Sequence, residues 1–250
     1  MTASTTLHLL CAGAAQGLVY ALQTRWLDGT GSTLGGRFGA VGAMQEALLA
    51  GEPCDVFVST DKLIGELIEA GWLRTGSRAV LGRVDTGIAV RAAAPHPDVA
   101  TPEELQAALL AADAIYFPDP LRATAGIHFA GVMRELGLFD TLAPRFRTYP
   151  NGATAMREMA ANAAPNLIGC TQVSEILFID GVELVAALPA RFELATTYTA
   201  AVSASATDPA QAQRFIEMLA GAESQALRAA AGFRALTPAL TPALSQGERA

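Results

Sequence analysis

The chain has 250 residues, of which 51% are hydrophobic and only 16% are charged, and its formal net charge at pH 7 is -7. This acidic balance, without any cluster of lysines and arginines, argues against a nucleic-acid-binding face. No apolar run approaches the roughly 20 residues that span a bilayer, so we expect a large buried core and no membrane insertion.

Short apolar runs alternate with stretches of helical periodicity along the chain, which is the pattern of α/β sheets covered by helices. Helices are expected between the strands, and a last short helix is expected over 224–231. The expected strands are, in chain order, 7–12, 56–59, 87–90, 114–117, 167–170, 183–186 and 197–203.

Two helices have clear start signals. Thr101 can cap a helix, Pro102 suits its first position, and Glu104 completes a capping box. Asp208, which is also followed by proline, predicts a helix that runs to about residue 220.

Four junctions share one pattern, in which an apolar strand meets a loop of small residues that opens a helix. These loops lie at 13–17, 38–44, 118–126 and 150–154. Such a helix start leaves backbone N–H groups unpaired at the positive end of the helix dipole, so it can receive an anion. Ligands of open α/β sheets bind outside the carboxyl ends of the strands, so the loops are expected to converge on one crevice.

Two similar segments, 86–90 and 197–202, indicate a pair of crossing strands around an inserted region, and such a double crossover forms a hinge. The tetrapeptide Thr-Pro-Ala-Leu occurs twice near the end of the chain, which is typical of a low-complexity extension. The predicted division is 1–84 plus 200–236 for lobe 1, 85–199 for lobe 2 with the hinge strands, and 237–250 for a disordered tail.

The cysteines and histidines indicate no metal site. The cysteines lie far apart in apolar contexts, and we expect all three in the core: Cys11, Cys54 and Cys170. The histidines have no ligand spacing: His8, His96 and His128. Walker, Rossmann and nucleophile-elbow motifs are also absent, so neither a metal nor a cofactor is expected.

The first six residues lead straight into a strand, without the basic region and cleavage site of a secretory signal. As written, the chain is therefore expected to be cytoplasmic, and a periplasmic location is expected if it is the mature form of an exported protein. We expect a monomer.

Several glycine-containing stretches carry a family resemblance. They are Phe-Gly-Ala-Val-Gly-Ala-Met at 38–44, Gly-Glu-Pro-Cys-Asp-Val-Phe-Val-Ser at 51–59 and Ile-Gly-Cys-Thr-Gln-Val at 168–173. Over roughly residues 5–235 the chain resembles the type 2 periplasmic-binding-protein fold, in particular the molybdate-binding proteins of ABC importers. The resemblance implies two α/β lobes, each a mixed sheet flanked by helices, joined by two crossing hinge strands and closing over a ligand. If the chain is exported, it also implies an importer permease as partner.

The chain departs from the molybdate-binding pattern. Such relatives place serine hydroxyls in the first and second loops, where this chain has alanines and Gln16, and Ala40-Val41. Where they have a tyrosine after the late strand, this chain has Gln172. Each unmet hydrogen bond in a closed site costs roughly 1–3 kcal/mol, so molybdate is not the expected ligand.

A small anion, an organic carboxylate or another oxyanion, is the expected ligand. Arg122 favours a carboxylate, because a planar guanidinium matches it in two hydrogen bonds, although a surface ion pair with Asp119 is an equal alternative. The expected binding residues are Ala14, Ala15, Gln16, Ala40, Val41, Gly42, Arg122, Thr124, Ala125, Gly126, Asn151, Gly152, Thr171 and Gln172.

An enzymatic alternative remains open, since aconitate isomerases resemble the same family and move a proton along an unsaturated carboxylate. Such an isomerisation needs anion clamps and one positioned base. The candidate bases are Asp119, His128 and Glu175, although Glu175 can instead cap or pair within its own helix. A cytoplasmic anion sensor or a partner of another enzyme are further uses of this fold.

Overall fold

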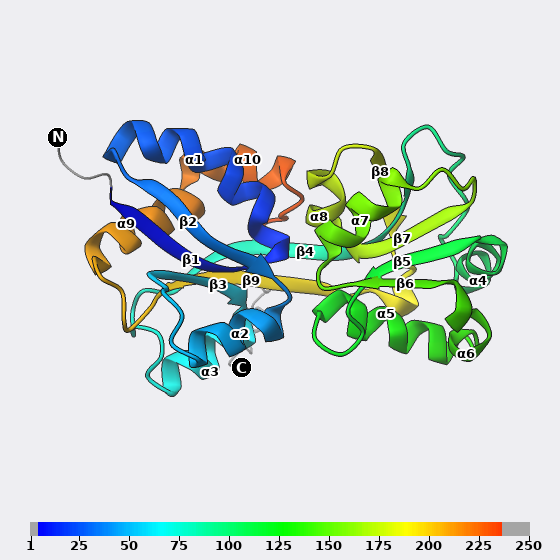
Figure 1. Ribbon diagram of the computed structural model, residues 1–250, viewed down its shortest axis with the longest axis horizontal. Helices are drawn as coiled ribbons and strands as arrows, with labels where there is room; N and C mark the ends of the chain where they lie inside the picture. The colour runs from blue at the N-terminus through cyan, green and yellow to red at the C-terminus, as the bar shows by residue number, and fades with distance from the viewer. Residues whose placement is uncertain (1–4, 237–250) are drawn as a thin grey trace, which may run out of the picture.

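A computed structural model describes residues 5–236 (Figure 1). Its strands are β1 (Thr6–Ala12), β2 (Thr33–Gly39), β3 (Val56–Thr60), β4 (Ala79–Arg91), β5 (Ala114–Pro118), β6 (Phe146–Tyr149), β7 (Leu167–Gln172), β8 (Val182–Ala187) and β9 (Ala195–Val202). Its helices are α1 (Gln16–Thr30), α2 (Val41–Leu49), α3 (Asp61–Glu69), α4 (Pro102–Ala111), α5 (Thr124–Glu135), α6 (Phe139–Leu142), α7 (Gly152–Ala161), α8 (Val173–Phe178), α9 (Pro209–Ala220) and α10 (Gln225–Ala230), with short 3-10 turns η1 (Gly13–Ala15), η2 (Ala143–Arg145), η3 (Ala190–Phe192) and η4 (Ala222–Ser224).

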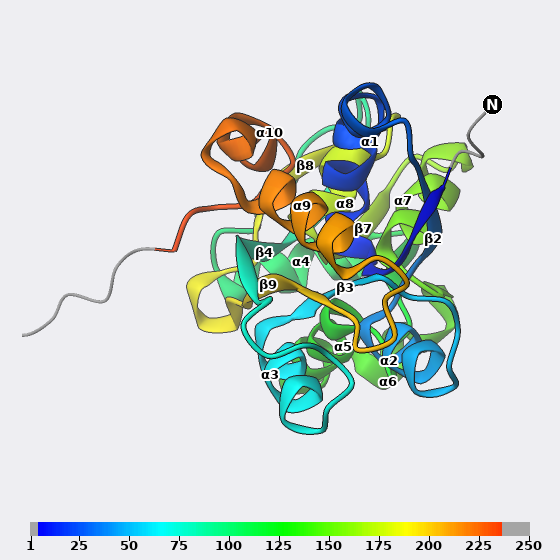
Figure 2. The ribbon, with the colours of Figure 1, turned by 90° about the vertical axis from the view of Figure 1, so that its left-hand side faces the viewer.

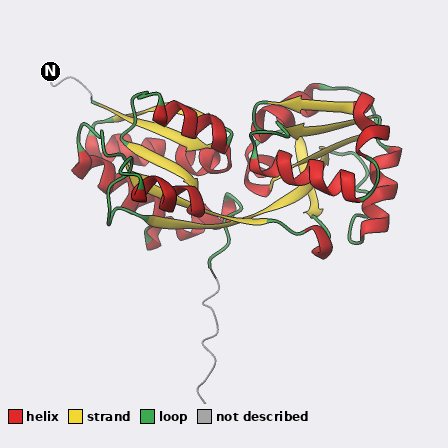
Figure 3. Ribbon diagram, turned by 90° about the horizontal axis from the view of Figure 1, so that it is seen from below, coloured by secondary structure: helices red, strands yellow, loops and turns green. Residues whose placement is uncertain are grey.

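The chain forms two α/β lobes joined by long strands, as the sequence predicted (Figures 1 and 3). The strand order is β2-β1-β3-β9-β4-β7-β5-β6, and β8 also pairs with β4. β4 belongs to both lobes, because it pairs with β9 from Ala79 to Asp85 and with β7 and β8 from Thr86 onward. The lobe boundaries at 84/85 and 199/200 stay a prediction, and the expected tail at 237–250 lies outside the described residues.

Each lobe contains a mixed sheet with helices on both faces. In lobe 1, β1 pairs in parallel with β2 and β3, and β3 pairs antiparallel with β9. In lobe 2, β5 pairs in parallel with β6 and β7, and β4 runs antiparallel to β7. Figure 2 shows the sheet of lobe 1 between α1 and α9 on one side and α2 and α3 on the other. Apolar clusters fill both faces of both sheets, which fixes the loops at their edges.

All seven expected strands are present, β6 is the strand that precedes the predicted loop at 150–154, and the sequence pattern missed β2. This strand reads Thr-Leu-Gly-Gly-Arg-Phe-Gly, and it lies at the sheet edge, where it pairs with β1. The expected loop at 38–44 is consequently much shorter: β2 ends at Gly39, α2 begins at Val41, and Ala40 alone connects them.

The predicted helix starts are confirmed where capping residues carry the signal. Thr101 and Glu104 form a reciprocal capping box on α4, and the Asp208 carboxylate accepts from the Gln211 N–H at the start of α9. Cys11, Cys54 and Cys170 are free and buried. Within residues 5–236, no helix has the length and apolar character needed to cross a membrane.

Candidate functional site

A small cavity lies where the two lobes meet. Its volume is about 20 Å³, which is room for about one water molecule. A larger ligand therefore requires the lobes to separate and close again around it. The cavity is lined by Ala12, Gly13, Ala14, Gly39, Ala40, Val41, Pro118, Ala123, Thr124, Ala125, Asn151, Gly152, Gln172, Glu175 and Tyr198.

Lobe 1 contributes two helix starts without polar side chains at their caps. Ala12 precedes η1, which continues into α1, and Ala40 precedes α2; neither residue makes a side-chain capping hydrogen bond. Alanine at this position costs about 0.5–2 kcal/mol relative to serine, threonine or aspartate. Gly13, Ala14, Ala40 and Val41 line the cavity, so the positive ends of both helix dipoles lie beside it.

Lobe 2 contributes a third such start at α5. Its N-cap is Ala123, again without a side-chain capping bond, and Thr124 and Ala125 line the cavity. Gly126 lies behind them rather than in the cavity, since a Cβ there would collide with the carbonyl oxygens of Pro118 and Asp119. This close approach fixes α5 against the end of β5, so Gly126 has a packing role.

The start of α7 differs, because a carboxylate already occupies it. Glu175 Oε1 accepts from the N–H groups of Gly152 at 3.1 Å and Ala153 at 3.3 Å, and Oε2 accepts from Thr171 Oγ1 at 2.5 Å. The Asn151 side chain accepts from the Thr154 N–H at 2.8 Å. Burial raises the pKa of the Glu175 carboxyl, and the hydrogen bonds that it accepts lower it. The result is a buried acid in the wall of the cavity.

Two more polar side chains complete the lining. Gln172 Nε2 donates a long hydrogen bond of 3.4 Å to Thr86 Oγ1, while its buried Oε1 has no partner among the described residues. Tyr198 extends from β9, and burial raises the pKa of its hydroxyl well above the usual range, so the hydroxyl stays protonated. Gln172 thus presents an unpartnered acceptor in the lining, and Tyr198 a protonated hydroxyl.

The structure places several expected binding residues outside the cavity. Ala15 is buried in the core of lobe 1, and Gln16 Nε2 donates to the Tyr20 hydroxyl at 3.3 Å. Thr171 does not line the cavity and reaches it only through Glu175.

Gly42 and Arg122 contribute to an interlobe contact that we call the latch. The Arg122 guanidinium pairs with Glu46 of α2 rather than with Asp119, and the Gly42 N–H donates to the Arg122 carbonyl at 3.4 Å. Half of the Arg122 side chain is exposed. The latch thus connects α2 of lobe 1 to the loop before α5 of lobe 2, beside the cavity rather than within it.

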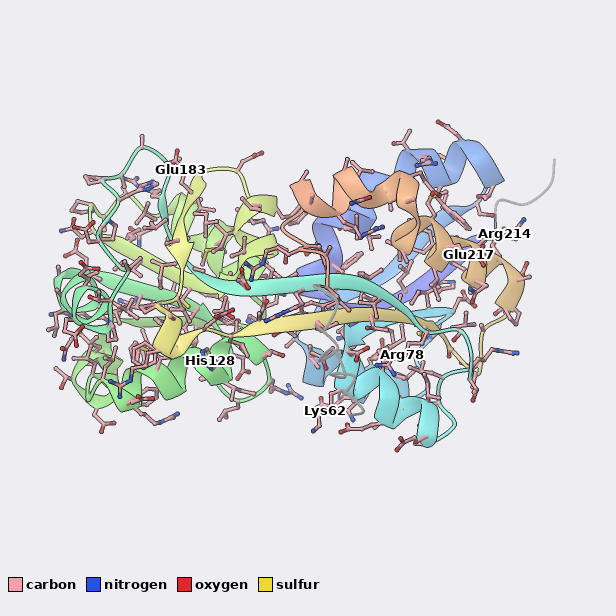
Figure 4. The ribbon with its side chains drawn as sticks, turned by 180° about the vertical axis from the view of Figure 1, so that it is seen from behind. Lys62, Arg78, His128, Glu183, Arg214 and Glu217 are labelled. Carbon is pink, nitrogen blue, oxygen red and sulfur yellow. The ribbon has the colours of Figure 1, made fainter. Side chains whose placement is uncertain are left out.

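Asp119 and His128, which were expected as candidate bases, also lie outside the cavity lining. Asp119 Oδ1 accepts from the Leu121 N–H at 2.7 Å, which stabilises the turn after β5. His128 Nε2 donates to the Phe192 carbonyl at 2.7 Å, and Figure 4 shows this histidine on the α5 face near η3. Of the three acid–base candidates, Glu175 alone lines the cavity. Within the described residues, no group of three His, Cys, Asp or Glu side chains could hold a metal ion.

Sequence reasoning missed Ala12, Gly13, Gly39, Pro118, Ala123 and Tyr198 as lining residues. Five of them belong to the predicted loops or adjoin them, so the loop signal found their position. Tyr198 lies in a hinge strand and had no such signal. Its one distinguishing mark was a tyrosine among threonines and alanines in a strand predicted to cross between lobes.

The profile of a family described as bacterial extracellular solute-binding protein matches residues 7–234. A curated aconitate isomerase from a Pseudomonas species is 24% identical over 229 residues, covering 88% of this chain and 84% of that protein.

Solved structures agree on the fold. The periplasmic molybdate-binding protein of Azotobacter vinelandii has a TM-score of 0.75 at 21% identity, covering 92% of this chain and all of that one. The sulfate-binding protein of Mycobacterium tuberculosis has a TM-score of 0.71 at 17% identity, covering 94% of this chain and 88% of that one.

Proposed function

Because the chain belongs to the bacterial extracellular solute-binding protein family, we propose that it binds a small anion reversibly between its two lobes. The observation that carries this proposal is the convergence of three helix starts with alanine N-caps on one cavity. Outside the cavity, α4 and α9 are capped by Thr101 and Asp208. The start of α3, also outside the cavity, has no side-chain cap either, so the convergence of the three starts carries the proposal. A bound anion would supply at the cavity the acceptors that Thr101 and Asp208 supply to α4 and α9.

The proposed ligand is an organic carboxylate or another oxyanion, and not molybdate. Apart from the Tyr198 hydroxyl of β9, the lobe 1 wall has no hydroxyl group, so its helix starts offer backbone N–H donors only. The Glu175 carboxylate lies in the opposite wall, and it disfavours a fully ionised dianion close to it. Thr124, Asn151 and Tyr198 are the side-chain donors in the lining that no described hydrogen bond engages, whereas Gln172 Nε2 already donates to Thr86.

Isomerisation of an unsaturated carboxylate remains the alternative, but the comparisons do not favour it. The aconitate isomerase relative belongs to the same group of folds and is only 24% identical, so the likeness does not separate catalysis from binding. Glu175 is the single candidate base that lines the cavity, and its carboxylate oxygens already accept four hydrogen bonds. Turnover of cis- or trans-aconitate by the purified protein would support the alternative.

We further propose that the protein acts as a monomer, and that an exported form delivers its ligand to an importer permease. In that case the working location is periplasmic, and the latch between α2 and the loop before α5 reports the closed, deliverable state. A cytoplasmic form would instead serve as an anion sensor.

A thermal-shift panel tests the proposed function. Succinate, malate, cis-aconitate, sulfate and molybdate are each added to the purified protein, and a ligand at about 100 times its dissociation constant stabilises by roughly 2.7 kcal/mol. We expect at least one carboxylate to raise the melting temperature more than molybdate does. No shift with any anion would contradict the proposal, and a shift with molybdate alone would contradict the ligand class.

A matched pair of variants locates the binding. Ala14→Asp places a negative charge at a helix start inside the cavity, where it takes the place of the ligand, so we expect the ligand-induced shift to be lost. Ala14→Asn adds nearly the same volume without the charge and is expected to keep part of the shift. Equal shifts in both variants and the wild type would mean that the anion binds elsewhere.

A further inference from the structure

Glycines of both lobes leave the space that the Glu175 carboxylate occupies. A Cβ at Gly13 in η1, or at Gly152 at the start of α7, would collide with the Glu175 carboxylate. Glu175 is only 5% exposed. Two glycines from different lobes thus leave space for one buried acid in the wall of the anion cavity.

No cation neutralises this carboxylate. None of the ion pairs formed within residues 5–236 includes Glu175, and the cavity lining contains no lysine, arginine or histidine. Its stabilisation comes from hydrogen bonds alone: backbone N–H groups of Gly152, Ala153 and Gln172, and the Thr171 hydroxyl. A bound anion would therefore bring a second negative charge beside an uncompensated first one.

None of the groups that face Glu175 changes its charge, so Glu175 is the acid that responds when an anion binds. β7 presents Thr171, α7 presents Gly152 and Ala153, and η1 presents Gly13, none of which titrates. β9 presents Tyr198, which stays protonated because burial and the nearby Glu175 raise the pKa of its hydroxyl.

The other elements that pack against α8 contact side chains of α8 other than Glu175. Phe178 packs against Gly17 of α1, Val173 packs against Gly87 of β4, and Leu177 packs against Gly232 beyond α10. β8 reaches this region through Leu184. These contacts bring no charged group to the carboxylate.

Resting on the proposed function, we propose that an anion enters this cavity together with one proton, which the ligand and the Glu175 carboxylate then share. The proton comes from solvent, no covalent bond is formed, and the closed site gains one negative charge and one positive charge. Two acids held together in a closed site retain one proton between them, because full ionisation of both is disfavoured. The raised pKa of Glu175 in the ligand-free protein is consistent with this behaviour.

Isothermal titration calorimetry measures the proton directly. The probe is the tightest binder among succinate, cis-aconitate and sulfate, titrated at pH 7.5 in PIPES and in Tris, two buffers with different ionisation enthalpies. We expect an uptake approaching one proton per ligand, and an affinity that weakens by up to about tenfold for each pH unit from 7 to 9. This wild-type measurement depends on no variant.

Two variants assign the proton to Glu175. Glu175→Gln is expected to bind without proton uptake and with an affinity that does not change between pH 7 and 9. Thr171→Val removes the hydroxyl that stabilises the ionised carboxylate, so Glu175 carries more of its proton beforehand and the uptake at pH 7.5 is expected to fall. Glu217→Gln, the same chemical change on α9 far from the cavity, is expected to match the wild type (Figure 4).

The outcomes separate this inference from the proposed function. Anion binding without proton uptake in the wild type overturns the proton coupling and leaves the binding function intact. Uptake that persists unchanged in Glu175→Gln assigns the proton to another group and also overturns the inference. If none of the three anions binds at any pH, both proposals fail together.

Discussion

The two walls of the cavity are built on different principles. Lobe 1 presents Gly13, Ala14, Ala40 and Val41, which offer backbone N–H groups and no polar side chain. Lobe 2 presents Thr124 and Asn151 at the starts of α5 and α7, Gln172 at the end of β7 and Glu175 on α8, whose carboxylate occupies the start of α7. In the proposed function, the lobe 1 wall attracts negative charge in general, while the lobe 2 wall selects which anion is accepted.

The difference predicts where substitutions act. Changes on the lobe 1 wall alter whether the lobes can close on any anion, because this wall works through backbone and shape. Changes on the lobe 2 wall alter selectivity and pH dependence, because this wall works through side-chain chemistry.

Gly13→Ala should have the largest effect. The added Cβ meets the Glu175 carboxylate, so closure requires one of them to move. Overpacking of this kind costs about 1–3 kcal/mol, so we expect a loss of about 5- to 150-fold in anion affinity by calorimetry. Gly29→Ala in α1 is the matched control, since nothing lies within 4 Å of its added Cβ. Equal effects of both substitutions would contradict the account of the lobe 1 wall.

Glu175→Gln should change how stability depends on pH. Burial raises the folded pKa of Glu175 above that of a carboxyl in the unfolded chain, so the native state binds more protons than the unfolded state between the two values. The stability that protonated Glu175 contributes to the wild type should thus be lost as the pH rises from about the unfolded pKa through the raised folded pKa.

Glu175→Gln should not lose stability over this pH range, and it should be the more stable protein at pH values above the folded pKa of Glu175. Urea denaturation at pH 4 to 8 checks the difference. A wild type that gains stability from this group as pH rises would show that the folded pKa is instead depressed.

Ala40→Ser should have a smaller effect that makes the two walls more alike. The new hydroxyl can cap α2, which stabilises by about 0.5–2 kcal/mol, and it adds a side-chain donor at a helix start of the lobe 1 wall. We expect a higher melting temperature and a shift of preference toward molybdate, whose binding proteins resemble this chain but have serines in the loop. Ala50→Ser, at the other end of α2, is the control and should leave selectivity unchanged.

Glu46→Gln should have the smallest effect. It weakens the latch to Arg122, an exposed ion pair of the kind that contributes little in water. We expect a slight rise in the radius of gyration of the ligand-free protein by small-angle scattering. Glu52→Gln removes the exposed pair with Arg37 inside lobe 1 and should leave the radius unchanged. A large opening caused by Glu46→Gln would mean that the latch, and not the cavity, holds the lobes together.

Local signals in the sequence predicted much of the fold. The capping box of Thr101 and Glu104 and the cap at Asp208 involve residues three apart, so pattern and spacing identify them. β2 escaped because its glycines remove the apolar alternation, and its place is fixed by pairing with β1 instead.

The site was predictable at the level of loops but not of individual side chains. The roles of Arg122 and Glu175 depend on residues far away in the chain: Glu46 in the other lobe for Arg122, and Gly13 and Gly152 for Glu175. The pairing of Glu175 with Gly152 arises when lobe 2 folds, those of Arg122 with Glu46 and of Glu175 with Gly13 arise when the lobes meet, and no local spacing encodes any of them.

The most direct test of the central claim is the amide NMR spectrum of the ¹⁵N-labelled protein during titration with succinate. If the anion binds at the uncapped helix starts, the amide signals of Ala14, Val41 and Ala125 should shift together and saturate with one dissociation constant. The amides of Glu104 and Gln211, which side chains already cap, should not move. Saturable shifts at the capped helices, with the three cavity amides unchanged, would contradict the claim.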